Sequence, residues 1–490
     1  FTVGDGISST LWKTDGTEEG TIEVSSSVSN IGELTVMGDA LYFRGKSSGN
    51  DRELWKTDGT TAGTVRVKDI NPGNAGSVPQ ALTVAGGTLF FNADDGINGG
   101  ELWKSDGTED GTVLVKDIRP GGSHSNIIEM VSIGDIVYFR ADDGNIGREL
   151  WRSDGTEEGT YLVKDIAPGW ESSNPKQMTL IGDRLFFTAD DDEAGDEVWI
   201  SDGTESGTVM VANVNQNEYD SNPLEYVKLG NLIVFAAHLG TQRLVSYDPT
   251  DILYHSNEGM HWSITPSLPE GLTLDSNTGK ITGIPTEVMD LTDYKVTLTA
   301  NDPDGDTYFY NGDGSTSLLK DIRVGDYGSN APSFPVVING IAYFGATDGY
   351  TASDNGTELW RTDGTEDGTY MVKDIYPGAA SGYRSNLASR PIVFNDNVYF
   401  QGRNDTTGHE LWKSDGTAEG TVLVKDLSEG TGDSYFESLT IFNDELYFIT
   451  TSPDSNKKEI FKTDGTEEGT VQLTDIHENN GGVMDPLVEA

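Results

Sequence analysis

The 490-residue sequence predicts an all-β protein, a β-propeller of eight or nine four-stranded blades with an inserted Ig-like β-sandwich domain. Three observations lead to this prediction. A strand–turn–strand motif recurs along the chain, several times at a constant spacing of 48 residues. Two further apolar strand patterns precede most copies of the motif. One break in the spacing holds a segment of different character. A fixed period of about 40–50 residues is typical of repeat architectures.

The motif is clearest between Glu101 and Ile118, which reads ELWKSDGTEDGTVLVKDI. Its first four residues alternate between apolar and polar and include an aromatic side chain, which favours a strand. Asp106-Gly107 then indicates a turn, because this dipeptide adopts the positive φ angles of a tight hairpin. The β-branched segment 113–115 reads as the partner strand. Each copy therefore predicts an antiparallel hairpin.

The motif occurs in nine copies, each marked by one aromatic residue. In the sixth copy, the degraded segment 244–248, this residue is assigned by adding one period to Trp199. An aromatic residue at one strand position of every repeat is expected to pack between neighbouring blades, rather than to lie exposed for stacking on sugars. The nine aromatic residues are Trp12, Trp55, Trp103, Trp151, Trp199, Tyr247, Trp360, Trp412 and Phe461.

Two more strands are expected before each hairpin. In the third repeat they are residues 81–84 and 89–91, joined by Gly86-Gly87. Four short antiparallel strands per repeat, with no helical periodicity, form the plan of a propeller blade. Equivalents of the second strand are expected at 41–43, 137–139, 185–187, 233–235, 342–344, 398–400 and 446–448.

The two ends of the chain indicate how the ring closes. Residues 1–3 resemble the end of a second strand, so the first repeat lacks an opening strand. Residues 483–488 follow the last copy and read as such an opening strand. We expect this C-terminal strand to complete the N-terminal blade, because closure leaves no exposed sheet edge. An open solenoid is the alternative. We also expect the chain to begin after processing, or to be cut from a longer protein.

The regular spacing breaks between Tyr247 and Trp360. The extra segment contains alternating strand patterns separated by Pro and Gly turns, which indicates an Ig-like sandwich. Insertion at a hairpin tip would leave the ring able to close. The predicted domains are therefore residues 1–248 (first part of the propeller), 249–311 (insert) and 312–490 (second part of the propeller).

Two stretches carry a family resemblance. The segments ELWKSDGTEDGT, ELWRSDGTEEGT and ELWRTDGTEDGT resemble the ELWxxDGT repeat of large bacterial and archaeal secreted or surface proteins. The LPEGLTLDSNTGKITGIP segment of the insert resembles Ig domains of the cadherin-like group that is common in bacterial adhesins. Both resemblances imply an extracellular, multidomain surface protein. Neither implies a set of catalytic residues.

Composition narrows the range of partners. The net charge is −49, from 81 acidic and 32 basic residues, which disfavours nucleic acid and anionic lipid. No apolar stretch approaches the length of about 18 residues that a membrane span needs, so no membrane insertion is expected. Cysteine is absent, which excludes disulfides, cysteine-based zinc sites and thiol catalysis.

Acidic loops suggest calcium as a cofactor. Aspartates cluster before several ELW strands, and alternate at the end of the insert in a pattern similar to the inter-domain calcium linkers of cadherin-like modules. Calcium takes six to eight oxygen ligands, and carboxylates in a Gly-containing loop can point together around one ion. Solvated acidic turns are the alternative. The candidate metal ligands are Asp302, Asp304, Asp306, Asp142, Asp143, Asp190 and Asp191.

No catalytic motif is present, and we expect that the protein is not an enzyme. The six histidines are scattered without ligand or triad spacing. The repeats are nearly identical, and the departing copy holds the insert instead of an active site. Abundant carboxylates leave a secreted glycosidase or lyase as an alternative, which predicts a non-repeated cluster of carboxylate, Tyr and Arg at the mouth of the central channel.

The expected function is that of an extracellular cell-surface structural or adhesion protein, a propeller scaffold with a projecting Ig-like arm. Self-assembly into a surface layer or filament is one form of this role. The expected partners are other copies of the chain, other cell-surface proteins and glycans. A carbohydrate-binding module is the first alternative, with Trp170 as its exposed ligand-binding residue, because this Trp lies off the repeat.

Overall fold

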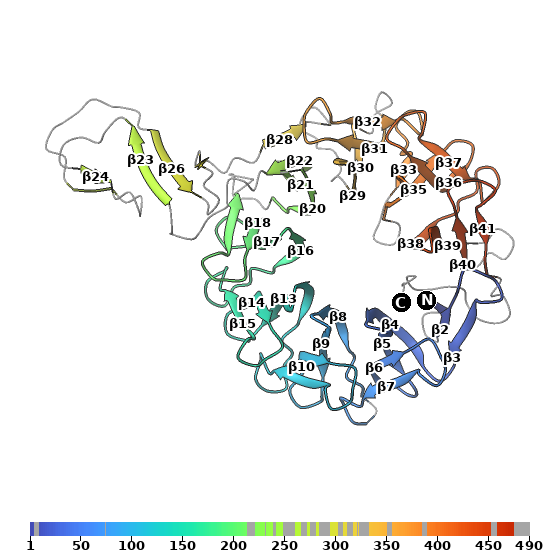
Figure 1. Ribbon diagram of the computed structural model, residues 1–490, viewed down its shortest axis with the longest axis horizontal. Helices are drawn as coiled ribbons and strands as arrows, with labels where there is room; N and C mark the ends of the chain where they lie inside the picture. The colour runs from blue at the N-terminus through green and yellow to red at the C-terminus, as the bar shows by residue number, and fades with distance from the viewer. Residues whose placement is uncertain are drawn as a thin grey trace.

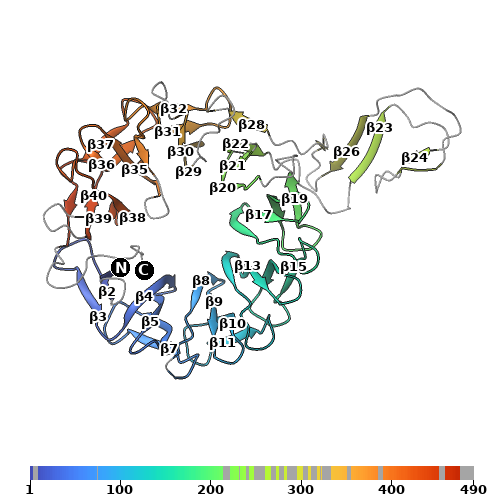
Figure 2. The ribbon, with the colours of Figure 1, turned by 180° about the vertical axis from the view of Figure 1, so that it is seen from behind.

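The structure is a computed structural model. It describes residues 1–3, 9–73, 75–212, 221–230, 232–238, 242–247, 260–265, 272–274, 281–283, 295–301, 307–310, 317–320, 322, 333–349, 355–384, 390–451 and 458–474. Nine β-sheets stand in a ring around a central axis, and each sheet is one blade (Figures 1 and 2). The chain is thus an all-β, nine-bladed β-propeller, which confirms the predicted fold class and decides for nine blades.

Within a blade the strands are antiparallel and follow chain order from the inner to the outer edge of the ring. Blade 1 comprises β1 (Thr2–Val3), β2 (Thr10–Lys13) and β3 (Ile22–Ser25). Blade 2 comprises β4 (Ser29–Met37), β5 (Ala40–Lys46), β6 (Arg52–Thr57) and β7 (Val65–Lys68). Blade 3 comprises β8 (Gln80–Ala85), β9 (Thr88–Asp94), β10 (Gly100–Ser105) and β11 (Val113–Lys116).

The next three blades follow the same plan. Blade 4 comprises β12 (Ile128–Ile133), β13 (Ile136–Asp142), β14 (Arg148–Ser153) and β15 (Tyr161–Lys164). Blade 5 comprises β16 (Lys176–Ile181), β17 (Arg184–Asp190), β18 (Asp196–Ser201) and β19 (Val209–Ala212). Blade 6 comprises β20 (Leu224–Leu229), β21 (Leu232–His238), β22 (Gln242–Tyr247) and β28 (Ser317–Lys320).

The last three blades return the chain to its start. Blade 7 comprises β29 (Ser333–Ile338), β30 (Ile341–Thr347), β31 (Thr357–Thr362) and β32 (Tyr370–Lys373). Blade 8 comprises β33 (Tyr383–Arg384), β34 (Ile392–Phe394), β35 (Asn397–Asn404), β36 (Gly408–Ser414) and β37 (Val422–Lys425). Blade 9 comprises β38 (Phe436–Phe442), β39 (Glu445–Thr451), β40 (Lys458–Thr463) and β41 (Val471–Gln472).

Nine apolar cores lie between the blades, and each joins one blade to the next. In the core between blades 2 and 3, Trp103 packs with Tyr42 and Leu54 and is 7% exposed. The repeated aromatic residue therefore packs between blades, as predicted. The ring closes through the same contact, since Phe1 and Val3 of blade 1 pack with Tyr447 of blade 9. An open solenoid is wrong.

The DGT loops owe their shape to the turn chemistry of the motif. Asp106 Oδ1 accepts hydrogen bonds from the N–H and the hydroxyl of Thr108, at 2.8 and 2.7 Å. Thr108 in turn accepts the N–H of Gly111 on its hydroxyl and the hydroxyl hydrogen of Thr112 on its carbonyl. Because each polar residue of the motif forms a specific hydrogen bond, the motif recurs almost unchanged along the chain.

Lysines connect each loop to the preceding blade. Lys104 Nζ donates to the Gly155 carbonyl at 2.8 Å, and Lys116 Nζ donates to the Thr160 carbonyl at 2.7 Å. The same contact recurs from blade to blade along the ring, for example at Lys56, Lys68, Lys164, Lys373, Lys413 and Lys425.

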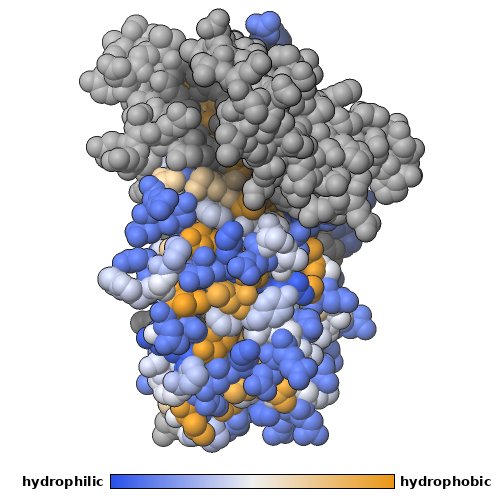
Figure 3. Space-filling model, turned by 90° about the vertical axis from the view of Figure 1, so that its left-hand side faces the viewer, coloured by the Kyte–Doolittle hydropathy of each residue, from blue (hydrophilic) through white to orange (hydrophobic). Residues whose placement is uncertain are grey.

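The outer side of the ring below the insert is mainly hydrophilic, with scattered hydrophobic residues (Figure 3). Exposed apolar or aromatic side chains recur at the first residue of the fourth strand, where one face of the sheet meets solvent. They are Ile22, Val65, Val113, Tyr161, Tyr370, Val422 and Val471. Among the described residues, no helix is long and apolar enough to cross a membrane.

Blade 6 corrects one prediction. The structure pairs Phe235 with Val245, just as it pairs Phe187 with Trp199 in blade 5. Val245, not Tyr247, therefore holds the position of the repeated aromatic. The reason is the loop between the second and third strands, which is two residues shorter in blade 6 than in blade 5. Counting one full period from Trp199 overshoots by that difference.

The insert leaves blade 6 between its third and fourth strands. Its described strands form two sheets, a three-stranded one and a two-stranded one, within the predicted range 249–311. Strands β23, β24 and β26 lie outside the ring (Figure 1). The strands are β23 (Met260–Thr265), β24 (Leu272–Leu274), β25 (Ile281–Gly283), β26 (Lys295–Asn301) and β27 (Thr307–Tyr310).

Blade 1 has three strands among the described residues, and the strand that would stand innermost is not one of them. The segment 483–488, which we expect to supply it, lies outside the described residues. Completion of blade 1 by this segment stays a prediction.

Candidate functional site

Besides blade 6 with its insert, two places in the ring depart from the repeat. The first is the contact between blades 8 and 9, where Arg384, Gln401, Arg403 and His409 of blade 8 meet the loop that leads into blade 9. We call these four residues, together with Asp433 and Tyr435 of that loop, the blade 8 seam. The second is a pocket where blades 9, 1 and 2 meet.

Blade 8 differs from the other blades in its inner strand. Nineteen residues separate Ile375 from Phe394, whereas fifteen separate the equivalent Ile118 and Ile133 before blade 4. The inner strand is accordingly divided into β33 and β34, which both pair with β35. A second blade therefore departs from the repeat, in addition to blade 6 with its insert. We had expected only the insert-bearing repeat to depart.

Blade 8 also reverses a charge. Arg403 stands directly opposite His409, at the position that Asp142 holds opposite Arg148 in blade 4. In blade 4, Asp142 forms an ion pair with Arg119, at 2.6 Å. In blade 8, the Arg119 position is taken by Tyr376, and the guanidinium carbon of Arg403 lies 4.9 Å from the centre of its ring. The two positions are thus in contact in both blades, but the anion Asp142 of blade 4 is replaced by the cation Arg403 in blade 8.

Sheet register brings the seam residues together. Arg384 pairs with Gln401 across β33 and β35, and Arg403 pairs with His409 across β35 and β36. Directly opposed residues, and residues two apart on one strand, share a face of a sheet. Leu411, the other partner of Gln401, packs in the core shared with blade 9. All four side chains therefore face blade 9.

The loop of blade 9 completes the seam. Asp433 accepts the backbone N–H of His409 at 2.9 Å and the hydroxyl hydrogen of Tyr435 at 3.0 Å. The ring of Tyr435 lies 5.1 Å from that of His409. Arg384 also lies over the ring of Tyr435, with its guanidinium carbon 4.6 Å from the ring centre. At the position of Asp433, other seams carry His124, Ser172 or Ser381.

The seam holds a neutral imidazole between two cations. Burial lowers the pKa of His409 to about 4, the Asp433 carboxylate opposes this shift, and the two arginines add to it. His409 is thus uncharged near neutral pH. In the described part of the chain, His409 Nδ1, Gln401 Nε2 and Arg403 Nε are buried without a hydrogen-bond partner. The seam therefore combines fixed positive charge with unused hydrogen-bonding groups.

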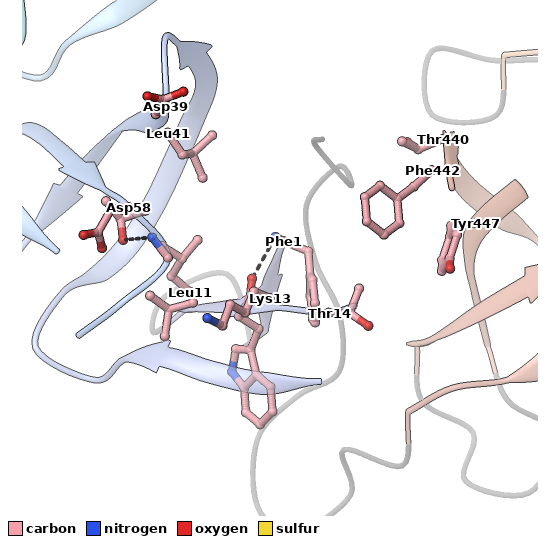
Figure 4. Close-up of a pocket in the computed structure, with 14 residues that line it drawn as sticks. Phe1, Leu11, Lys13, Thr14, Asp39, Leu41, Asp58, Thr440, Phe442 and Tyr447 are labelled. Carbon is pink, nitrogen blue, oxygen red and sulfur yellow. Dashed lines mark hydrogen bonds between the residues drawn. The ribbon is translucent and has the colours of Figure 1, made fainter. Parts of the chain in front are cut away.

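The pocket between blades 9, 1 and 2 has a volume of about 300 Å³. Thr440, Phe442 and Tyr447 of blade 9 line one side, Leu41 and Asp39 of blade 2 line the other, and Phe1 lies between them (Figure 4). Most of the lining is apolar. The pocket lies beside blade 1, whose innermost strand is not among the described residues, and its largely apolar lining suits a further peptide segment better than a reaction.

The predicted blade-loop ligands are engaged in other contacts. Asp142 binds Arg119 through Oδ2 and accepts the N–H of Gly144 on Oδ1. Asp143 Oδ1 accepts two backbone N–H groups, at 2.8 and 3.0 Å. In blade 5, Asp190 and Asp191 likewise accept backbone N–H groups of their own turn. Hydrogen bonds within the loop thus occupy an oxygen of each carboxylate.

Calcium binding remains a prediction for the acidic loops. Asp302, Asp304 and Asp306 lie outside the described residues. Among the described residues, the group of three acidic side chains close enough to share an ion is Asp51, Glu53 and Asp69, whose oxygens lie within 4.8 Å of one another.

This group already has a cation. Arg66 lies 3.1 Å from Asp51 and 3.2 Å from Asp69, through one oxygen of each. Glu53 is buried and accepts the N–H groups of Ile70 and Ser77. The second oxygens of Asp51 and Asp69 are buried without a partner among the described residues. A metal ion here would have to compete with Arg66. The sequence does not reveal the group, because Asp69 follows β7 whereas Asp51 and Glu53 lie at the start of β6, sixteen or more residues earlier in the chain.

Trp170 is 80% exposed, which agrees with its selection as a candidate ligand-binding residue. It lies in the loop between β15 and β16. Glycan binding at Trp170 stays a prediction.

A family model described as "Putative Ig domain" matches residues 236–313. This match identifies the insert and extends beyond it into strands β21 and β22 of blade 6. No curated protein matches the chain.

Among solved structures, the chain is similar to propeller-containing proteins. The β-propeller domain of the trilobed protease from Pyrococcus furiosus is 12% identical, with 82% of this chain and 98% of that chain covered and a TM-score of 0.33. A puromycin hydrolase is 10% identical, with 82% and 54% covered and a TM-score of 0.34. A prolyl endopeptidase is 12% identical, with 81% and 49% covered and a TM-score of 0.36. The chain spans about half the length of the last two.

Proposed function

We propose that the protein is a non-enzymatic, extracellular scaffold for cell-surface structure or adhesion, in which the ring holds the Ig-like insert as a contact arm. The observation that carries this proposal is the point of insertion. Ser246 and Ser317 are paired neighbours on β22 and β28, so the chain leaves the ring and returns to it at one place. An arm attached in this way can be presented without disturbing the blade.

The sequence resemblances support the same role. The ELWxxDGT repeats and the cadherin-like pattern of the insert are both associated with bacterial and archaeal surface proteins. The partner would be another copy of the chain, another surface protein or a glycan. A contact between the arm and a different surface of a second copy is heterologous, and such contacts build layers or filaments when they do not close.

Calcium belongs to this proposal at one place. Asp302, Asp304 and Asp306 alternate near the end of the insert, close in sequence to its return to blade 6. A calcium ion held by these carboxylates would stiffen the arm. The expected result is a higher melting temperature with calcium than with a chelator, and the Asp304→Asn variant should lose the difference.

No catalytic residue is part of the proposal. Asp433 is the carboxylate of the blade 8 seam, and it already accepts hydrogen bonds from His409 and Tyr435. It holds the backbone of His409 and the side chain of Tyr435 in place. A glycosidase would need a second carboxylate placed across a sugar from the first, and the seam residues do not include one.

The test of the arm uses the register of blade 5. Tyr247 corresponds to Ser201, and Ser317 corresponds to Val209, by their strand pairings. Residues 248–316 are therefore replaced by the seven residues 202–208 of blade 5, DGTESGT. The ring should fold with an unchanged melting temperature, while self-association and adhesion, measured by light scattering and cell binding, should be lost. Full association without the arm would contradict the proposal.

A further inference from the structure

The two arginines of the blade 8 seam are unusual in a chain of net charge −49. Some cations elsewhere on the ring are paired with carboxylates, as in Arg44 with Glu33 and Lys176 with Asp196. Among the residues that the structure describes, no carboxylate oxygen lies within 4.0 Å of the side-chain nitrogens of Arg384 or Arg403. Asp433 of the seam interacts electrostatically with Arg403, but two guanidinium groups against one carboxylate leave a net positive charge for a ligand.

We propose that the blade 8 seam binds an anionic saccharide, a sugar that carries carboxylate or sulfate groups, through Arg384 and Arg403. The inference does not rest on the arm, because the seam lies in blades 8 and 9 and the arm leaves from blade 6.

Stacking prepares both arginines for this role. Each guanidinium carbon lies less than 5 Å above a tyrosine ring, Arg384 on Tyr435 and Arg403 on Tyr376. A guanidinium held face-on against a ring keeps its N–H edge free. That edge forms two parallel hydrogen bonds with a carboxylate or a sulfate. Because the rings hold the planes in place, little side-chain entropy is lost on binding.

The surroundings of the arginines suit a sugar. Gln401 Nε2 and His409 Nδ1 are buried beside them, without a partner among the described residues. Saccharides offer many hydroxyl groups, and one of these, or a bridging water, can pair with such an atom once the side chains that cover it shift on binding. Asp433 fixes the loop that carries Tyr435, and so positions the platform on which Arg384 lies.

The location also suits an extended ligand. Arg384 lies on β33, in the place of the innermost strand of its blade, so the seam reaches the inner edge of the ring (Figures 1 and 2). Nucleic acid is a poor alternative, because its dense charge is repelled by the acidic remainder of the surface. A short saccharide with one acidic group per sugar matches two separate arginines better.

The experiment measures binding to the full chain by isothermal titration calorimetry at low salt. The probes are a galacturonate trimer, a sulfated heparin-derived tetrasaccharide and neutral maltotriose. The variants are Arg384→Gln, Arg403→Gln and both together. Arg361→Gln is the matched control, because Arg361 lies 5.1 Å from the ring centre of Tyr370 in a similar stack outside the seam.

We expect the chain to bind one or both anionic oligosaccharides and not maltotriose. Each seam substitution should weaken binding about tenfold or more, since hydrogen bonds to charged groups are lost. Binding by Arg361→Gln and by the arm-deleted ring should be unchanged, and added salt should weaken binding. Preference for the galacturonate or the sulfated probe identifies the acidic group.

Three results would overturn the inference. They are an absence of binding to both anionic probes, binding that the double variant leaves intact, and binding that Arg361→Gln weakens equally. Arg403→Lys keeps the positive charge but loses the two parallel N–H donors of the guanidinium group. This variant is expected to fold and to bind with an affinity between those of the unmodified chain and Arg403→Gln.

Discussion

At the scale of single residues, the residues that recur in every repeat stabilise the ring, and the residues that differ from the repeat are available for recognition. The Asp, Gly and Thr of each loop satisfy one another, and the Lys of the fourth strand connects two blades. The loop Gly is needed for a further reason. Gly416 has φ +90, and a Cβ there would lie 2.1 Å from the hydroxyl oxygen of Tyr343 in the preceding blade. Few other residues could replace any of these letters.

The repeated Trp predicts a clear stability difference. Trp103→Ala removes a side chain that is 7% exposed and packs between blades 2 and 3. The expected loss is about 3–5 kcal/mol in the free energy of unfolding, from the cavity left behind. Trp170→Ala is the matched control, because Trp170 is 80% exposed. Thermal unfolding followed by circular dichroism measures both; equal melting temperatures for the two variants would refute the packing role.

The buried glutamates predict how stability depends on pH. Burial raises the pKa of Glu101, Glu149 and Glu410 from 4.5 to about 7. Their folded forms bind a proton more tightly than the unfolded chain, so stability should rise as pH falls from about 8 to about 4.5. Hydrogen bonds donated by Thr108 lower the pKa of Asp106, whose contribution to stability is instead lost as the pH falls from the ordinary value of 3.8 through the lowered pKa of the folded state.

Chemical denaturation between pH 3 and pH 8 measures this dependence. Maximum stability is expected between about pH 4 and pH 5. Glu101→Gln should flatten the slope above pH 5, whereas Glu109→Gln, at an exposed loop position, should leave it unchanged. This pair separates the buried glutamate from the general relief of charge repulsion at low pH. A stability that falls from pH 8 to pH 5 would contradict the assignment.

At the scale of elements, local patterns predict strands well. The expected strands 81–84, 89–91, 101–104 and 113–115 fall within β8, β9, β10 and β11. Alternation and Asp-Gly turns are local signals, so the sequence contains them. Register across a changed loop is different, because a count of residues cannot tell which side of a gap has shortened. For this reason Tyr247 was assigned to the position that Val245 holds.

The candidate site was harder to predict. Arg384, His409 and Asp433 come from three segments of two blades, and pairing of β33 with β35 depends on the four extra residues of the inner strand. A usable signal did exist, since Arg403 stands where blades 3, 4 and 5 carry Asp94, Asp142 and Asp190. Clusters of one residue type are easier to recognise in a sequence, and the aspartates of the acidic loops form such clusters. Their hydrogen bonds to neighbouring N–H groups could not be read from composition.

Blade 1, which has three strands among the described residues, predicts a role for the C-terminal segment. Deleting residues 483–490 should lower the melting temperature, because the apolar pocket of about 300 Å³ would lose the segment that we expect to fill it. Leu487→Asp should act in the same direction without shortening the chain. A synthetic peptide of residues 483–490 should restore stability to the deleted form. An unchanged melting temperature in both variants would refute completion of blade 1 by this segment.

At the scale of the whole molecule, nine similar blades form one closed ring with nine inter-blade cores. Each blade contacts its two neighbours, so stability is spread evenly around the ring. Such a scaffold tolerates sequence changes at positions that the repeated contacts do not use. The insert of blade 6 and the inner strand of blade 8 are examples. We infer that the repeated positions supply rigidity and that these two departures supply recognition.

This separation is tested most directly by measuring two quantities in the same two variants, the melting temperature and the affinity for the galacturonate trimer. Trp103→Ala should lower the melting temperature and, at a temperature where it is folded, bind like the unmodified chain. Arg403→Gln should keep the melting temperature and lose affinity by about tenfold or more. The account is contradicted if Arg403→Gln unfolds as early as Trp103→Ala, or if the two variants bind equally well.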